Sequence, residues 1–309
     1  MASEEIIVSI SCITYNHAPY IRQCLDGFMM QQTDFDFEVL IHDDASTDGT
    51  AEIIKEYEAK YPNIIKPIYE EENQWVKGRR GSAVFNFPRA KGKYIAICEG
   101  DDYWTDHLKL QKQVDFLEGH NEYSLCGHRF MAYVENLSKF IPHGHNISGS
   151  FDLGTLVNEH KFCSTLSIMF RKTALNIDEF MKHKQTMDIV LYYHLLKNGK
   201  GYCLPDLMAV YRIHDGGVWT NASRQQRILT DINIRLGIYE VDRTRSAATF
   251  IKTYLSKFVG RKWLLTHLNI LWSCLQSMIE QFGLLSTVRY IVCDLIIRRN
   301  ASLVSGKKS

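Results

Sequence analysis

Three groups of polar residues each follow an apolar, β-branched run, and their residue types suit the binding of a metal ion and a phosphate-bearing ligand. The groups are Thr14-Tyr15-Asn16-His17, Asp43-Asp44 and Asp101-Asp102. Adjacent carboxylates repel each other unless a positive partner lies beside them. Mg²⁺ or Mn²⁺ is a suitable partner, because these ions take one or two carboxylates from a protein and their other ligands from phosphate and water. Asp101-Asp102 therefore predicts a metal and diphosphate site, with a solvated turn as the alternative.

The elements that must position these groups are strands that alternate with helices. The apolar runs predict strands at residues 6–13, 37–41, 64–68 and 93–98. Ile21, Leu25 and Phe28 are spaced by four and three residues, which predicts a helix with one apolar face. Such an alternation implies a mainly parallel sheet with right-handed crossovers. Because ligands bind beyond the carboxyl ends of parallel strands, we expect the three polar groups to converge.

The rest of the chain has weaker patterns. Cys163–Phe170 predicts a strand, and Asp188–Leu196 predicts a helix with an acidic residue at its positive end. From about residue 221 onward, long apolar and polar patterns with few Gly or Pro predict several helices. A length of 309 residues is compatible with about two domains.

The composition excludes several classes of protein. Hydrophobic residues make up 45% and charged residues 23%, which is typical of folded globular chains and not of disordered ones. The net charge of +1 gives no electrostatic reason to expect nucleic acid as a partner. The eight cysteines include no Cys-x-x-Cys pair for zinc or redox chemistry, and the acidic N-terminus does not resemble a secretory signal. We therefore expect a cytoplasmic protein.

Three motifs resemble those of the GT-A glycosyltransferases of family two, and they occur in the same order. They are Val8–Asn16 (VSISCITYN), Val39–Thr50 (VLIHDDASTDGT) and Ala90–Asp102 (AKGKYIAICEGDD). The resemblance covers residues 6–220 and implies an α/β, Rossmann-like GT-A fold with a mainly parallel sheet flanked by helices. The implied organisation is a glycosyltransferase domain at 1–220, with a nucleotide-sugar half at about 1–110 and an acceptor half at about 111–220, followed by a helical C-terminal extension at 221–309.

The resemblance also implies a reaction. It is an inverting transfer of a sugar from a UDP- or dTDP-sugar donor to a glycan or lipid-linked saccharide, assisted by Mn²⁺ or Mg²⁺, in surface polysaccharide biosynthesis. By analogy Asp102 binds the metal ion, and His214 in a Tyr-Arg-x-His segment helps to hold the metal or the diphosphate. Asp101 contacts the ribose or the sugar, and Arg212 pairs with phosphate.

The same analogy assigns residues to the nucleotide pocket. Thr14, Tyr15 and Asn16 line the pocket, while Asp43 recognises the base and Asp44 lies close by. Each of the two aspartates also has a simpler interpretation as part of a turn.

The resemblance also predicts roles for Arg89 and Asp188. Arg89 faces the donor by analogy, although Pro88-Arg89-Ala90 stands where the family usually has an Ala-Arg-Asn triplet. Asp188 resembles the acidic residue at the start of the family's acceptor-side helix, which takes the proton of the acceptor hydroxyl. A helix N-cap is the alternative role for Asp188, and Asp178-Glu179 is the competing candidate for the base.

Two rival functions remain open at this point. A sugar nucleotidyltransferase would be expected to have a Gly-rich, basic loop after its first strand, where this chain has Thr14–His17. A non-catalytic nucleotide-sugar-binding or scaffold protein would have no need to keep Asp102, Asp188 and His214 together. The chain has neither a GxGxxG nor a P-loop motif, which disfavours dinucleotide and P-loop chemistry.

Two basic segments have alternative roles. From Lys257 to the C-terminus there are eight basic and two acidic residues, with an apolar helical face predicted at 263–275. This tail either packs on the enzyme, packs against a second copy in a homodimer, or contacts an anionic membrane surface at the inner face of the membrane. The loop from Trp75 to Arg80 is either solvated or forms a lid near the diphosphate.

Overall fold

The structure is a computed structural model. It describes residues 5–78, 81–142, 148–159, 163–183, 188–217 and 222–258, together with Trp272, Leu275, Gln276, Ile279 and Glu280. Contacts divide the chain into two compact units, one of residues 1–156 and 161–221 and the other of residues 157–160 and 222–309. The first unit contains every residue that the sequence assigns to the site.

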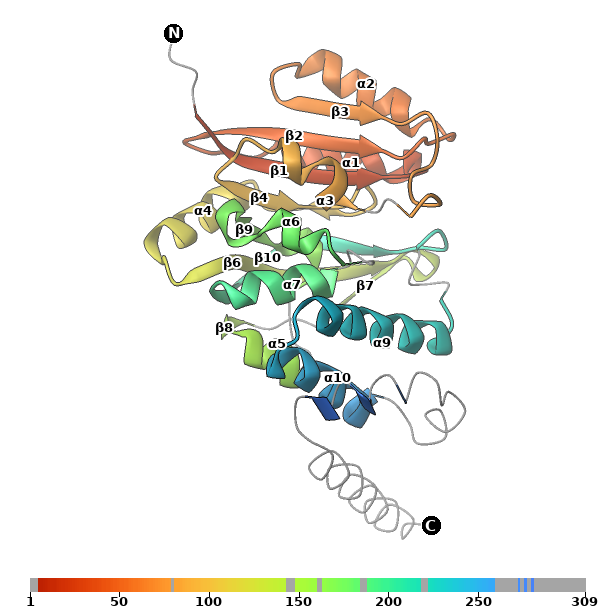
Figure 1. Ribbon diagram of the computed structural model, residues 1–309. Helices are drawn as coiled ribbons and strands as arrows, with labels where there is room; N and C mark the ends of the chain where they lie inside the picture. Colours follow the sequence, from red (N-terminus) through yellow and green to blue (C-terminus); the bar gives the residue numbers. More distant parts are fainter. Residues whose placement is uncertain are drawn as a thin grey trace, which may run out of the picture. The chain divides into compact units, whose positions relative to one another are not determined.

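The first unit is built on a ten-stranded sheet (Figure 1). Its parallel part has the order β3 (Ile65–Tyr69), β2 (Asp36–Asp43), β1 (Ile6–Thr14) and β4 (Tyr94–Ile97). A second parallel pair, β6 (Tyr123–Val134) and β10 (Lys200–Ile213), joins β4 through the antiparallel β9 (Met169–Arg171). The outer strands are β5 (Tyr103–Trp104), β7 (Lys139–Pro142) and β8 (Gly149–Phe151). The predicted α/β class with a mainly parallel sheet is therefore confirmed.

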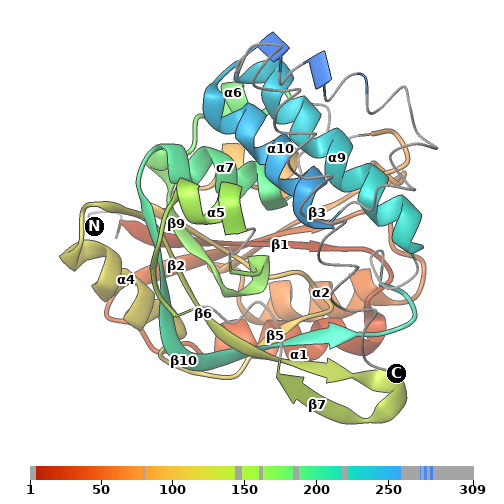
Figure 2. The same cartoon turned by 90° about the horizontal axis from the view of Figure 1, so that it is seen from below.

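Helices cover both faces of this sheet (Figure 2), with α1 (Ala18–Met29) and α2 (Thr50–Lys60) on one face and α7 (Asp188–Lys197) on the other. The shorter or peripheral helices are α3 (Ser82–Phe85), α4 (Lys109–Gly119), α5 (Leu153–Glu159) and α6 (Ile177–Phe180). The apolar face predicted for α1 is confirmed, because Ile21, Leu25 and Phe28 are fully buried in the same core as Val8 and Ile10 of β1.

The strand predicted at Cys163–Phe170 is only partly correct. A 3₁₀ turn occupies Thr165–Ser167, and the strand β9 begins at Met169. The turn forms because distant groups bond to it. Leu166 O accepts a hydrogen bond from Trp104 Nε1 at 2.8 Å, and Thr165 Oγ1 donates to Glu99 Oε2 at 3.1 Å.

The second unit contains the helices α9 (Arg224–Val241) and α10 (Arg245–Phe258). Ser223 and Gln226 form a capping box at the start of α9. The Arg235 guanidinium lies over the rings of Phe250 and Tyr254, at 4.6 and 3.9 Å, and pairs with Asp231 at 3.0 Å. A cation that is stacked and paired in this way can be buried between two helices.

Several expectations fall on parts of the chain that the structure does not describe. Arg79 and Arg80 of the basic loop lie outside the described residues, as does most of the tail from residue 259. The helical face predicted at 263–275 therefore stays a prediction. In the part of the chain that is described, no helix is both long and apolar enough to cross a membrane.

Candidate active site

The three polar groups that follow the strands converge at one edge of the sheet. Thr14 at the end of β1 is paired in register with Asp43 at the end of β2. Asp44 N donates to Thr14 O at 3.0 Å, and Gly100 N donates to Ile13 O at 3.0 Å. A Cβ atom at Gly100 would lie 2.7 Å from Thr14 Oγ1. Only glycine therefore lets the acidic loop, Glu99–Asp102, approach β1 this closely.

Two cavities open at this edge. The larger has a volume of about 510 Å³ and the smaller about 260 Å³. They share the wall residues Ile13, Trp75, Gly81, Glu99, Asp101 and Gly217. Thr14 Oγ1 and His17 Nδ1, on residues that line the larger cavity, are buried and have no hydrogen-bond partner within the described chain. Polar atoms left in this state are typical of a site that binds a polar ligand.

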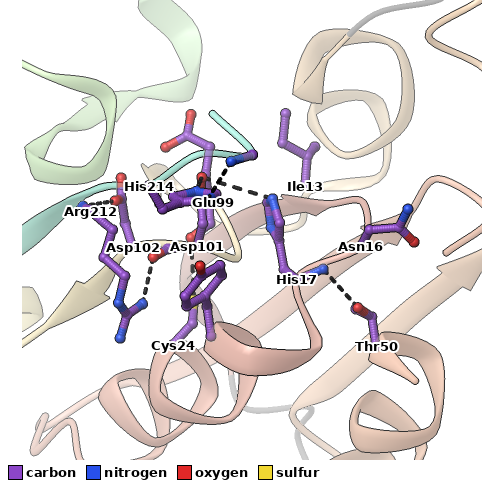
Figure 3. Close-up of polar contacts among 12 residues, drawn as sticks. Ile13, Asn16, His17, Cys24, Thr50, Glu99, Asp101, Asp102, Arg212 and His214 are labelled. Carbon is purple, nitrogen blue, oxygen red and sulfur yellow. Dashed lines mark hydrogen bonds and ion pairs between the residues drawn. The ribbon is translucent and has the colours of Figure 1, made fainter. Parts of the chain in front are cut away.

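Asp101 lies between two histidines (Figure 3). Its Oδ2 is 3.2 Å from His214 Nε2 and 3.8 Å from His17 Nε2. Burial opposes the ionisation of Asp101, but the hydrogen bond from His214 and the neighbouring His17 lower its pKa below the usual value. The pKa of His17 is lowered by burial, against the attraction of Asp101.

Asp102, which the sequence assigned to the metal, is in a different position. It is 2% exposed, and its Oδ1 accepts a hydrogen bond from Arg212 N at 2.8 Å. Its pKa is raised by burial and by the neighbouring carboxylates of Asp101 and Glu99. The structure thus places His214 beside Asp101, whereas the backbone N–H of Arg212 on β10 binds Asp102 Oδ1.

The donor set around Asp101 fits a divalent cation. One carboxylate and one imidazole are suitable ligands for Mn²⁺. Asp101 Oδ2 and His214 Nε2 already lie side by side, 3.2 Å apart and joined by a hydrogen bond. No cluster of three or more His, Cys, Asp or Glu side chains able to hold a metal is found among the described residues. A cation held here would therefore need further ligands from phosphate or water.

The contacts of His214 define which ring nitrogen carries its proton. Gly216 N donates to His214 Nδ1 at 3.2 Å, so in this arrangement His214 carries its proton on Nε2. Metal ligation through Nε2 requires the proton on Nδ1, and this tautomer cannot accept from Gly216.

Arg212 fixes the backbone of the acidic loop. Its guanidinium donates to Asp101 O and to Gln23 Oε1. It also lies 4.5 Å from the ring centre of Tyr103 and 5.1 Å from that of Tyr20. Arg212 is 7% exposed and lines the smaller cavity, so any contact with phosphate would be made by a side chain that is already fixed.

The residues predicted to line the nucleotide pocket lie on the loops that follow β1 and β2. Tyr15 is 46% exposed and lines the larger cavity with Thr14 and Asp44. Asn16 has a positive φ of 54°, and its Oδ1 accepts from Thr47 N at 2.9 Å. Asn16 therefore links the loop after β1 to the loop after β2 and is not a wall residue of either cavity.

Asp43 and Asp44 are both engaged by the protein. Asp43 Oδ1 accepts from Ser46 Oγ at 2.5 Å, and burial raises the pKa of Asp43. Asp44 accepts from Gln74 N at 2.6 Å and from Trp75 N at 3.2 Å. Asp44 lines the larger cavity, whereas Asp43 lines neither cavity.

The structure corrects the position expected for Arg89. Its guanidinium donates to Lys66 O, Ile41 O and Asn86 Oδ1, each at 2.9 Å, and Arg89 lines neither cavity. Arg89 therefore ties β2 and β3 to the segment before β4. The reason is that the N–H groups of its guanidinium are hydrogen-bonded to three carbonyl oxygens of the protein and so do not face a ligand.

Asp188 lies at the first position of α7 and lines the smaller cavity with Glu99 and Asp102. Its side chain is accessible to solvent, but protein surrounds the cavity, and this desolvation raises the pKa of Asp188 to about 6. The competing pair, Asp178-Glu179, lies in the first turn of α6 and lines neither cavity.

Glu99 is a site residue that sequence reasoning missed. It lines both cavities and accepts from Thr165 Oγ1 at 3.1 Å. Burial, followed by the charges of Asp188 and Asp101, raises its pKa to about 8. Its place at the start of the acidic Glu-Gly-Asp-Asp motif was the available signal. His17 was also present in the first polar group, but its sequence context gave it no individual role.

The fold and the site define an α/β protein with a ligand pocket at the carboxyl ends of parallel strands, beside an acidic loop. The family model described as glycosyl transferase family 2 matches residues 9–177, and the chain belongs to this family. The resemblance of the sequence motifs to GT-A enzymes is therefore confirmed.

Two relatives illustrate the similarity of this chain to known proteins. The uncharacterized protein Rv1520 of Mycobacterium tuberculosis is 39% identical over 71% of this chain and 62% of its own length. The putative teichuronic acid biosynthesis glycosyltransferase TuaG of Bacillus subtilis is 28% identical over 72% of this chain and 84% of its own. The chain thus spans somewhat less than two thirds of the Mycobacterium protein.

Among solved structures, S. aureus TarS in complex with UDP-GlcNAc superposes with a TM-score of 0.64. The match covers 88% of this chain and 82% of the TarS chain at 19% sequence identity. At this identity the likeness establishes the fold, which is GT-A.

Arg89→Met should lower stability and leave nucleotide affinity unchanged. Met keeps the length of the side chain but leaves three partly buried acceptors without their donors, at a cost of about 1–3 kcal/mol. Chemical denaturation measures the loss, and calorimetric titration with UDP measures the affinity. A large loss of UDP affinity in a folded Arg89→Met protein would instead return Arg89 to the donor site.

Proposed function

We propose that this protein is an inverting glycosyltransferase that moves a sugar from a UDP- or dTDP-sugar to a glycan or lipid-linked saccharide in surface polysaccharide biosynthesis. The observation that carries the proposal is that Asp101 and Asp188 line one cavity, which shares a wall with a larger pocket at the strand ends. The similarity to TuaG, a putative teichuronic acid biosynthesis glycosyltransferase, supports a role in surface polysaccharide biosynthesis, and the UDP-GlcNAc complex of TarS supports a UDP-sugar donor.

In this proposal the larger cavity takes the nucleotide. Its polar end, near Asp101 and His17, is suited to the diphosphate, and its other end takes the base. The smaller cavity takes the transferred sugar and the acceptor hydroxyl. Its apolar wall includes Phe180 and Leu191, which would exclude water from the reacting atoms.

Asp188 is the proposed catalytic base. It would accept the proton of the acceptor hydroxyl while the hydroxyl oxygen bonds to the anomeric carbon and the bond to the diphosphate oxygen breaks. A pKa of about 6 leaves the Asp188 carboxylate ionised at neutral pH. It also makes this carboxylate a stronger base than an ordinary aspartate, because the best pKa for a general base lies near the working pH. Attack on the face opposite the diphosphate inverts the anomeric configuration.

Asp101 and His214 are the proposed ligands of Mn²⁺ or Mg²⁺. A divalent cation supplies Lewis-acid stabilisation of the charge that develops on the diphosphate. Arg212, fixed behind the loop by Asp101 O and Gln23, keeps the Asp101 carboxylate in place.

Asp188→Asn should keep donor binding and lose transfer. Asn cannot accept the proton, and loss of general base catalysis costs about 10²–10⁴-fold in turnover. UDP affinity is measured by titration and transfer by UDP release with an acceptor present. Transfer that survives at the wild-type rate would place the base elsewhere.

The wild-type pH profile gives a second test of Asp188. Its raised pKa means that protonation removes the base form as pH falls below about 6. We expect kcat/KM to fall about tenfold per pH unit below that point. A profile that stays flat down to pH 5 would contradict the assignment.

Asp101→Asn should remove the dependence of UDP affinity on Mn²⁺, since a neutral amide is a poor ligand for a hard cation. Asp102→Asn is the matched control, because its amide oxygen can still accept from Arg212 N and keep the loop in place. Titrations with UDP in Mn²⁺ and in EDTA compare the two variants. Loss of the metal effect in Asp102→Asn alone would restore the assignment made from the sequence.

Peripheral membrane contact through the basic tail is part of the proposal. Changing Lys257, Arg261, Lys262, Arg289, Arg298 and Arg299 to Gln in the full chain should release the protein from anionic vesicles. Each basic residue near such a surface contributes about 1 kcal/mol. Sedimentation with anionic and neutral vesicles measures the partition. Equal partition of the variant and the wild type would favour packing of the tail on protein.

A further inference from the structure

We infer that His42 recognises the base of the donor nucleotide by accepting a hydrogen bond from a ring N–H, a group that uracil, thymine and guanine carry and that cytosine and adenine lack. This inference rests on the proposed function, which assigns the larger cavity to the nucleotide. It replaces Asp43, the residue that the sequence assigned to the base.

The position of His42 is the first support. His42 lies on β2, is 4% exposed, and lines the larger cavity together with Asp44 and Tyr15. It does not line the smaller cavity, where Asp188 lies. His42 is therefore not part of the wall that the two cavities share.

Two contacts fix the imidazole ring. The ring stacks on Phe85 with a centroid separation of 3.7 Å and an interplanar angle of 15°. Its Nε2 lies 3.2 Å from Glu70 Oε1. Stacking sets the plane of the ring and the carboxylate sets its rotation, so the remaining ring nitrogen has a defined position.

The chemistry of the contact with Glu70 decides what that nitrogen can do. An ionised carboxylate only accepts hydrogen bonds, so His42 Nε2 must carry the proton. Burial lowers the pKa of His42, which keeps the ring neutral. In this tautomer Nδ1 has a lone pair and is an acceptor. No group in the described part of the chain donates a hydrogen bond to Nδ1.

The two aspartates beside His42 make hydrogen bonds within the protein. Asp43 binds Ser46 and lines neither cavity, while both carboxylate oxygens of Asp44 accept from the backbone of Gln74 and Trp75. Asp44 therefore anchors the segment that forms one wall of the cavity. His42 contributes a neutral acceptor that no folding contact occupies.

The experiment compares nucleotide pairs in which one member carries the ring N–H and the other does not. Dissociation constants of the full chain are measured by calorimetry with Mn²⁺ for UDP against CDP, and for GDP against ADP. The wild type should prefer the member with the ring N–H by about tenfold or more, as expected when a buried acceptor loses its donor. The pair with the larger preference and affinity identifies whether a pyrimidine or a purine fits.

Two variants of His42 provide the matched test. His42→Gln places an amide near the former Nε2 and can keep the contact with Glu70, but it removes the acceptor at Nδ1. Its preference should fall to within about twofold of unity. His42→Asn places its amide near the former Nδ1 and should retain most of the preference. His120, an exposed histidine that lines neither cavity, is the control as His120→Gln.

The outcomes separate the two proposals. An unchanged preference in a folded His42→Gln protein that still binds UDP would overturn the role of His42 and leave the donor site intact. Failure of the wild type to bind any nucleoside diphosphate, with Mn²⁺ or Mg²⁺, would overturn both. Loss of preference in His42→Gln with retention in His42→Asn would support the inference.

Discussion

The concentration of negative charge on the four residues Glu99–Asp102 is the constraint on which the rest of the site depends. Three carboxylates follow a buried strand, and burial alone favours their neutral forms. Groups that are distant in the sequence stabilise the charged carboxylates. Arg212 and His214 arrive on β10 and the loop after it, and His17 precedes α1. The pairing of the strands therefore decides which positive or hydrogen-bonding groups lie beside the carboxylates of this loop.

The same constraint gives the three carboxyl groups different properties. Asp101, between two histidines, has a lowered pKa, whereas Asp102 and Glu99 have raised ones. A group that stays ionised beside an imidazole is suited to a cation, and a group held by a backbone N–H is suited to fixing the loop. Asp188 adds a fourth carboxylate on another element, α7, and its pKa of about 6 suits proton transfer at neutral pH. Adjacent residues of one type thus acquire separate tasks from their surroundings.

The larger cavity is organised by a different principle. Asp44 on its wall anchors one loop, and Asn16, which follows the wall residue Tyr15, anchors another. Asp44 holds the backbone of Gln74 and Trp75, and Asn16 holds Thr47. Fixing the walls before a ligand arrives lowers the entropy cost of binding. The ring of His42, held by Phe85 and Glu70, has the same preorganised character.

The sequence by itself determined the parallel strands, the apolar face of α1 and the convergence of the three polar groups. These follow from local periodicity and from the rule that parallel strands end at the same edge. Only the tertiary structure decided which carboxylate meets His214, where Arg89 points, and that Glu99 and His42 line the cavities. Each of these outcomes depends on partners far apart in the chain, such as Arg212 with Asp102 and Thr165 with Glu99. The turn at Thr165–Ser167 replaced a predicted strand for the same reason, because a distant tryptophan and a distant carboxylate bond to it. Residue type and spacing define which groups can do chemistry, but competition among nearby donors and acceptors in the folded chain decides which of them remain available for a ligand.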